Sequence, residues 1–158
     1  MALPDTGKKA PDFTLLDHLG ESVTLSDFIG SHNVLVYFYP KAMTPGCTVQ
    51  AQGLRDVASE LAGRDVVVLG ISPDPVKRLA KFVERDALNF KLLSDEDHAV
   101  ADAYGAWGPK KFMGREFDGI LRTSYLVDKS GNLCSIIDKF KTKEHHEVVL
   151  NTIAELDL

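Results

Sequence analysis

The chain of 158 residues suits one domain (1–158) of ordinary size, long enough to bury a sizeable core. Its 44% hydrophobic content is normal for a globular protein, and its net charge of −5 argues against nucleic acid or an anionic membrane as a partner. Two cysteines make no disulfide framework and fit a reducing compartment. No window approaches the roughly 20 apolar residues of a membrane span, and the N-terminus lacks the apolar stretch of a secretory signal. We therefore expect a cytoplasmic protein.

The first third of the chain predicts a hairpin followed by a buried strand. Residues 1–11 read as an irregular arm. The apolar runs 13–16 and 23–25 flank a turn, which is typical of a β-hairpin, and 26–30 suggest one helical turn closed by glycine. A run of apolar and aromatic residues then predicts a central strand at about 33–39, which Pro40 ends because it has no backbone N–H.

The next stretch predicts a strand, a helix and a second parallel strand. Apolar spacing indicates a helix at about 46–62 that stops at Gly63. Another fully buried strand follows at 66–71. Short connections of this kind give a right-handed βαβ unit with parallel strands.

The second half adds further helices and strands around the same sheet. We expect helices at 75–86, from a capping box at 94–97 to about 104, and at 143–156, and strands at 90–93, 121–127 and 133–139. Residues 105–119 hold four glycines and predict an ordered loop. The fold class is therefore α/β, with a central mixed β-sheet flanked by helices and an N-terminal β-hairpin extension.

Cys47 is placed where a thiol becomes reactive. It follows Pro45-Gly46 and opens the helical pattern, so its sulfur faces unpaired backbone N–H groups and the positive end of the helix dipole. Both favour the thiolate, which is the nucleophilic form. The alternative is a small apolar side chain that fills space in the core.

The residues around this cysteine resemble the peroxiredoxins. Pro40-x-x-x-Thr44-x-x-Cys47 matches the active-site signature of that family. The longer run 38–56 resembles the branch called bacterioferritin comigratory protein, or peroxiredoxin Q, and further matches lie at 93–96, 104–108 and 119–124. The resemblance covers nearly the whole chain and implies a thioredoxin-like fold.

The resemblance also implies a function and a set of site residues. Cys47 would attack a peroxide and become a sulfenic acid, with Arg122 holding both sulfur and substrate. Thr44 would bind the peroxide, Pro40 would cover the sulfur, and backbone N–H groups near Gly46 would be further donors. From the residues alone, Arg122 is better explained as a solvent-exposed arginine at a strand edge, because arginine is mostly exposed. Thr44 could equally be a helix cap, and it could have both roles.

The chain departs from this branch at the resolving cysteine. Many members carry a second cysteine five residues after the first, where this chain has Gln52, or on the next helix, where it has Val83 and Glu84. The other cysteine, Cys134, lies in a predicted strand that gives no reason for a low pKa, so we expect a bystander. An external thiol would then resolve the sulfenic acid.

The expected partners are a hydroperoxide and a thiol reductant, namely thioredoxin, glutaredoxin or a small thiol, acting on a monomer or weak dimer. No cofactor or metal is expected, because consecutive residues such as His145 and His146 point about 100° apart on a helix and share an ion poorly. Two other functions remain open from the sequence. One is a thiol–disulfide oxidoreductase, although the chain lacks Cys-x-x-Cys, and the other is a non-catalytic holdase or interaction domain.

Overall fold

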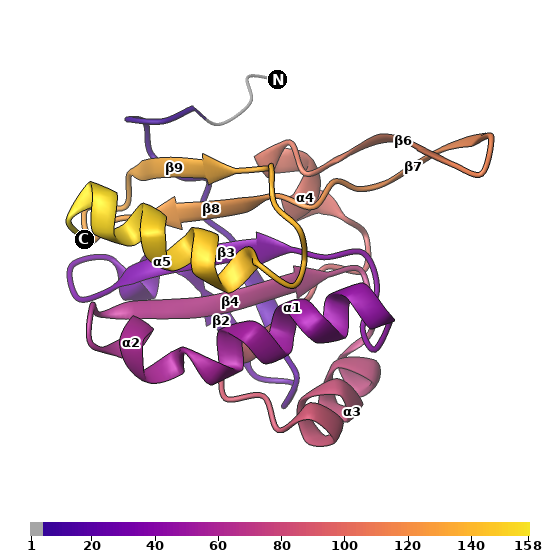
Figure 1. Ribbon diagram of the computed structural model, residues 1–158, viewed down its shortest axis with the longest axis horizontal. Coiled ribbons are helices and arrows are strands. Elements are labelled where there is room, and N and C mark those ends of the chain that lie inside the picture. The colour runs from indigo at the N-terminus through magenta and orange to yellow at the C-terminus, as the bar shows by residue number, and fades with distance from the viewer. Residues whose placement is uncertain (1–4) are drawn as a thin grey trace.

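The computed structural model, which describes residues 5–158, is built on a seven-stranded sheet in the order β2-β1-β5-β4-β3-β8-β9 (Figure 1). The strands of this sheet are β1 (Thr14–Asp17), β2 (Ser22–Thr24), β3 (Asn33–Phe38), β4 (Val66–Ser72), β5 (Lys91–Ser94), β8 (Ser124–Val127) and β9 (Leu133–Ile137). The central strands β3, β4 and β5 run parallel, and β8 and β9 add antiparallel strands at one side. The expected mixed sheet is confirmed.

The predicted N-terminal hairpin is present and belongs to this sheet. Strands β1 and β2 pair antiparallel, and β1 also pairs antiparallel with β5. The hairpin therefore extends the main sheet at one edge, because β1 continues the hydrogen-bond ladder of β5.

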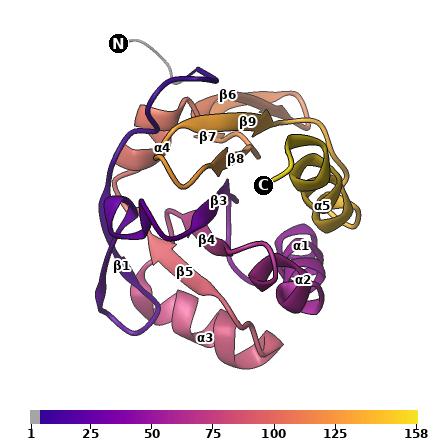
Figure 2. The ribbon, with the colours of Figure 1, turned by 90° about the vertical axis from the view of Figure 1, so that its left-hand side faces the viewer.

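Helices cover both faces of the sheet. Figure 2 shows α1, α2 and α5 on one side and α4 on the other. The helical elements are η1 (Leu25–Phe28), α1 (Pro45–Asp56), α2 (Ala58–Ala62), α3 (Val76–Asp86), α4 (Ala99–Tyr104) and α5 (His145–Leu156). Alternate residues of β3 point into two cores, with Leu35 and Tyr37 on the side of α1, α3 and α5, and Val36 and Phe38 on the side of α4. Among residues 5–158, no helix is both long and apolar enough to cross a bilayer.

Two helices differ from the sequence-based expectation. The helix expected at 46–62 is interrupted at Val57, whose φ of −107° and ψ of 15° leave the helical region and separate α1 from α2. The capping box expected at 94–97 does not begin a helix, because α4 starts only at Ala99. The Asp95 carboxylate instead accepts the N–H groups of Val100 and Ala101 from outside the helix.

The loop expected at 105–119 is a second, two-stranded sheet. Strands β6 (Trp107–Phe112) and β7 (Arg115–Ile120) form a hairpin that projects from the body of the protein (Figure 1). Its turn residues Met113 and Gly114 both have positive φ, 51° and 78°, as a two-residue hairpin turn requires. The prediction failed because a methionine seldom takes that conformation, and because Gly108 and Gly119, read as loop residues, pair across the ladder.

His145 is a fully buried histidine beneath the sheet. Its Nε2 lies 2.7 Å from Ser124 Oγ, and its ring centre lies 4.5 Å from that of Phe140 and 5.7 Å from that of Tyr37. Its Nδ1 has no hydrogen-bond partner among the described residues. Burial, with smaller contributions from His146 and Arg122, lowers the pKa of His145 to about 3. The folded protein therefore holds a neutral ring here.

We expect this histidine to make the fold sensitive to acid. The unfolded chain binds a proton at His145 as the pH falls through about 6.5, whereas the folded chain does not until about pH 3. Between these values the histidine favours unfolding, by about 2 kcal/mol on going from pH 7 to pH 5. Urea unfolding of wild type and His145→Gln at both pH values measures this effect. The variant should lose less stability than wild type on acidification, and equal losses would contradict the prediction.

Candidate active site

Cys47 lies where strand β3 gives way to helix α1. The strand ends at Phe38, half-buried Pro40 follows, and α1 begins at Pro45 with Thr44 as its N-cap residue. Cys47 is the third residue of α1 and is 2% exposed. Cys47 therefore lies in the first turn of the helix, as the sequence predicted, at the end where the backbone N–H groups have no partner within the helix.

The Arg122 guanidinium contacts this sulfur directly. Its Nη2 lies 3.3 Å from Cys47 Sγ, and its Nη1 donates to Gln50 Oε1 at 3.0 Å. A Cβ added to Gly46 would lie 3.2 Å from Nη2, so the glycine leaves the space that the guanidinium occupies. The structure thus brings together Cys47, Arg122 and Gly46, and a fixed positive charge beside the sulfur favours the thiolate.

The sheet explains how residues 75 positions apart come to meet. Strands β3 and β8 are antiparallel neighbours, with Tyr37 opposite Ser124. The chain that leaves β3 and the chain that enters β8 therefore lie at the same edge of the sheet. Cys47 follows the first and Arg122 precedes the second, so both side chains reach one place.

Thr44 is oriented by its own loop. It occupies the N-cap position, but its side chain makes no capping hydrogen bond. Its Oγ1 instead donates to the Lys41 carbonyl at 2.7 Å, which leaves the oxygen lone pairs free to accept. The expected alternative of a side-chain cap is therefore wrong for this residue.

An ion pair between the buried Asp74 carboxylate and the partly exposed Arg78 holds the loop between β3 and α1. The Asp74 carboxylate accepts the Ala42 N–H at 2.7 Å and the Ser72 hydroxyl at 2.8 Å. Arg78 pairs with Asp74 at 3.2 Å and donates to the Ala42 carbonyl at 2.8 Å, so both backbone groups of Ala42 are held. The next residue, Met43, has a φ of 66°, which is unfavourable for a side chain of this kind. The clamp stabilises the conformation that orients Thr44.

Cys134 lies away from this site. It is half-buried in β9, and its thiol donates to the Leu126 carbonyl at 3.2 Å. Burial, with the charge of Asp128, raises the pKa of the Cys134 thiol to about 11. Its neighbour Leu133 pairs with Val127, which is the last residue of β8, whereas Ser124 is the first. Because strands rise about 3.3 Å per residue, Cys134 lies toward the end of the sheet away from Cys47, and we expect its Cα atom to be beyond the roughly 7 Å that a disulfide to Cys47 allows.

Gln52, at the position compared above with the resolving cysteine of similar proteins, joins two helices. Its Nε2 donates to Asp86 Oδ1 at 3.0 Å, across the interface of α1 and α3. Arg85 donates to Thr48 Oγ1 at 2.7 Å, and Arg55 to the Asp86 carbonyl at 2.7 Å. The outer face of α1 is thus fixed to the C-terminal end of α3 by polar contacts.

The sequence-based reading missed three residues of the site. Gln50 could have been found, because it lies three positions after Cys47 and so on the same face of the helix. Asp74 and Arg78 could not, since no spacing connects α3 with the loop at Ala42. Within residues 5–158, no three His, Cys, Asp or Glu side chains cluster in the way a metal site needs.

Comparison with known proteins relates the whole chain to one family. The model of the AhpC/TSA family matches residues 6–136. The chain is 56% identical to the putative peroxiredoxin bcp of Haemophilus influenzae, over 95% of this chain and 96% of the relative. It is 43% identical to peroxiredoxin Bcp of Bacillus subtilis, over 96% of each chain.

Solved structures show the same fold. The peroxidoxin BcpB of Mycobacterium tuberculosis is 33% identical, with a TM-score of 0.85 over 97% of this chain and 98% of that one. The bacterioferritin comigratory protein of Xanthomonas campestris, studied for its alkyl peroxide reduction, is 28% identical, with a TM-score of 0.89 over 98% of this chain and 100% of that one. The thioredoxin-like fold expected from the sequence is confirmed.

The clamp on Ala42 leads to a prediction about Asp74→Asn. The variant removes a charged acceptor from the Ala42 N–H, so the loop should loosen and Thr44 should lose its orientation. We expect the rate at which hydrogen peroxide oxidises Cys47 to fall by about tenfold. The rate at which iodoacetamide alkylates Cys47 should fall much less, because this reaction needs the thiolate but not Thr44.

Asp65→Asn is the matched control, because it breaks the exposed Asp65–Lys129 ion pair away from the site. It should change neither rate. Equal losses of peroxide reaction and alkylation in Asp74→Asn would show a general structural defect instead of a positioning role.

Proposed function

The chain belongs to the AhpC/TSA family and is a peroxiredoxin, a thiol-dependent peroxidase, and on this premise we propose how its own residues carry out the reaction. Cys47 is the peroxidatic nucleophile, and hydrogen peroxide and organic hydroperoxides are its substrates. The single observation that carries the proposal is the 3.3 Å contact between Arg122 Nη2 and Cys47 Sγ at the first turn of α1.

The reaction breaks the O–O bond of a hydroperoxide ROOH. The Cys47 thiolate attacks one oxygen and forms an S–O bond, while the other oxygen leaves as ROH after it takes up a proton. Sulfur loses two electrons and the peroxide gains them, so the products are Cys47–SOH and water or an alcohol. No cofactor takes part in this balance.

Each neighbouring residue has a role in that step. Arg122 has five N–H donors, of which two are used by Cys47 and Gln50, so others are free for the peroxide oxygens. Thr44 Oγ1 accepts from the peroxide, since its own proton is directed to Lys41. The backbone N–H groups of Gly46 and Cys47 stabilise the developing charge, and half-buried Pro40 shields the sulfur from water.

The sulfenic acid is resolved by a thiol from outside the chain. Gln52 cannot form a disulfide, and Cys134 has a raised pKa and lies too far along the sheet. Thioredoxin, glutaredoxin and small thiols are the candidate reductants, and the enzyme works as a monomer or weak dimer. The two unpaired cysteines fit a cytoplasmic location, where thiols stay reduced.

Two cysteine variants test this one-cysteine cycle. Cys47→Ser should lose peroxide consumption with dithiothreitol by at least about a thousandfold, because serine supplies no thiolate. Cys134→Ser should stay within about twofold of wild type, since the Cys134 thiol is distant and protonated. Peroxide-treated protein should carry a dimedone adduct at Cys47 by mass spectrometry. A Cys47–Cys134 disulfide in oxidised wild type would refute the cycle.

A further inference from the structure

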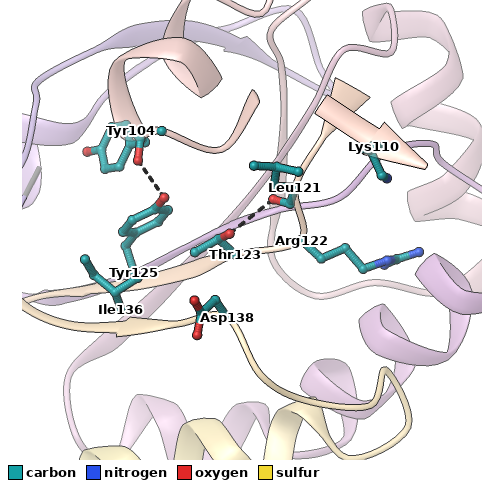
Figure 3. A pocket seen from close by; sticks show the side chains of 9 residues that line it. Tyr104, Lys110, Leu121, Arg122, Thr123, Tyr125, Ile136 and Asp138 are labelled. Atoms are coloured by element: carbon teal, nitrogen blue, oxygen red, sulfur yellow. Dashed lines mark hydrogen bonds between the residues drawn. The ribbon is translucent and has the colours of Figure 1, made fainter. Parts of the chain in front are cut away.

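A cavity of about 580 Å³ opens beside Arg122, and apart from Arg122 none of the residues that line it has a role in the peroxide step described above. Its volume lies within the range of roughly 300–1,000 Å³ that is usual for small-molecule sites. Figure 3 shows Lys110 and Arg122 on one side of it and Tyr104 and Tyr125 on the other, with Asp138 on a further wall. The lining residues are Tyr104, Gly105, Lys110, Leu121, Arg122, Thr123, Tyr125, Ile136 and Asp138.

Most polar groups of the wall already have partners within the protein. The Tyr125 hydroxyl donates to the Tyr104 carbonyl at 2.6 Å, and the Tyr104 hydroxyl donates to the Pro11 carbonyl at 2.6 Å. Thr123 Oγ1 donates to the Leu121 carbonyl at 3.3 Å. The aromatic rings therefore offer carbon surface, and the groups left for a ligand are charged.

Three charges line the cavity, and none of them forms an ion pair with another residue between 5 and 158. Lys110, Arg122 and Asp138 have no such partner in the described part of the chain, although Arg122 contacts Cys47. Burial and the nearby charge of Arg122 lower the pKa of Lys110, and the nearby Cys47 acts in the opposite direction, so Lys110 lies near both Arg122 and Cys47. The cavity thus carries a local charge of +1 on a chain whose net charge is −5.

This arrangement complements a small thiol that bears carboxylates and an ammonium group. Two carboxylates would pair with Lys110 and with the free N–H groups of Arg122, and an ammonium group would pair with Asp138. Such a thiol, of net charge −1, matches the local charge of +1. Because Arg122 lines the cavity and also contacts Cys47 Sγ, this side chain connects a ligand in the cavity with the sulfur to be reduced.

We propose that the cavity binds a small zwitterionic thiol of this class, and that Lys110 and Asp138 select it as the reductant of the Cys47 sulfenic acid. The proposal rests on the one-cysteine cycle proposed above. The first thiol RSH attacks sulfur, so that Cys47–SOH and RSH give Cys47–S–S–R and water. A second RSH then gives Cys47–SH and RSSR, and the two electrons taken by the peroxide are returned.

The test compares glutathione, which carries these charges, with uncharged dithiothreitol, at saturating hydrogen peroxide. The measured quantity is the ratio of kcat/KM for glutathione to kcat/KM for dithiothreitol, which cancels a general loss of activity. In Lys110→Gln this ratio should fall by about tenfold, and in Asp138→Asn by about threefold. Glutathione monoethyl ester, which lacks one carboxylate, should be a poorer reductant than glutathione for wild type but not for Lys110→Gln.

Lys111→Gln and Asp118→Asn are the matched controls, because both residues are exposed on the β6–β7 hairpin and neither lines the cavity. They should leave the ratio unchanged. If the ratio in Lys110→Gln equals that in Lys111→Gln, the assignment of the cavity is wrong. It is also wrong if a protein dithiol supports peroxide consumption by wild type and glutathione does not. If wild type consumes no peroxide even with dithiothreitol, the proposed function itself is wrong.

Discussion

The chemistry proposed for this protein depends on one contact, between the guanidinium of Arg122 and the sulfur of Cys47 at the N-terminus of α1. A sulfur that is 2% exposed is poorly solvated, so a charge on it must be stabilised by the protein. Arg122 supplies a permanent positive charge, and the helix supplies oriented N–H groups. The surrounding structure holds these two groups in place. Gln50 accepts a hydrogen bond from the guanidinium, and Gly46 leaves room for it. The antiparallel pairing of β3 with β8 brings the segments that carry Cys47 and Arg122 together.

Local features of the fold could be predicted from the sequence, and features set by distant contacts could not. The buried strand at 33–39 and the reactive position of Cys47 follow from apolar runs, proline and glycine, which act over a few residues. The role of Arg122 was predicted from the resemblance of the chain to a family, because no local sequence feature indicates that an arginine faces a sulfur. The Asp74–Arg78 pair joins Ala42 to the start of α3, and nothing in the sequence connects these two segments. The β6–β7 hairpin was missed because its turn uses Met113 in a conformation that favours glycine.

The proposed cycle without an internal resolving cysteine fits the contacts that Gln52 makes. Gln52 binds Asp86, and Arg85 binds Thr48, so polar contacts fix α1 to α3 near the reactive sulfur. A cycle that needs no internal disulfide also needs no rearrangement of α1, and these contacts can persist throughout. The oxidised sulfur must then be reached in the folded site, beside the same arginine that stabilised it as an anion. In the proposed cycle the peroxide and the reductant therefore reach the same sulfur in turn, and the charge of Arg122 affects both steps.

The most direct test of this account is the rate at which hydrogen peroxide oxidises Cys47 in single-turnover experiments on Arg122→Gln and Arg122→Lys. Glutamine removes the charge, and we expect the rate to fall by about a hundredfold or more. Lysine keeps the charge but not the planar pair of donors, so its rate should lie between those of Arg122→Gln and wild type. If Arg122→Gln reacts with peroxide within about twofold of wild type, the positive charge beside the sulfur is not what makes Cys47 reactive.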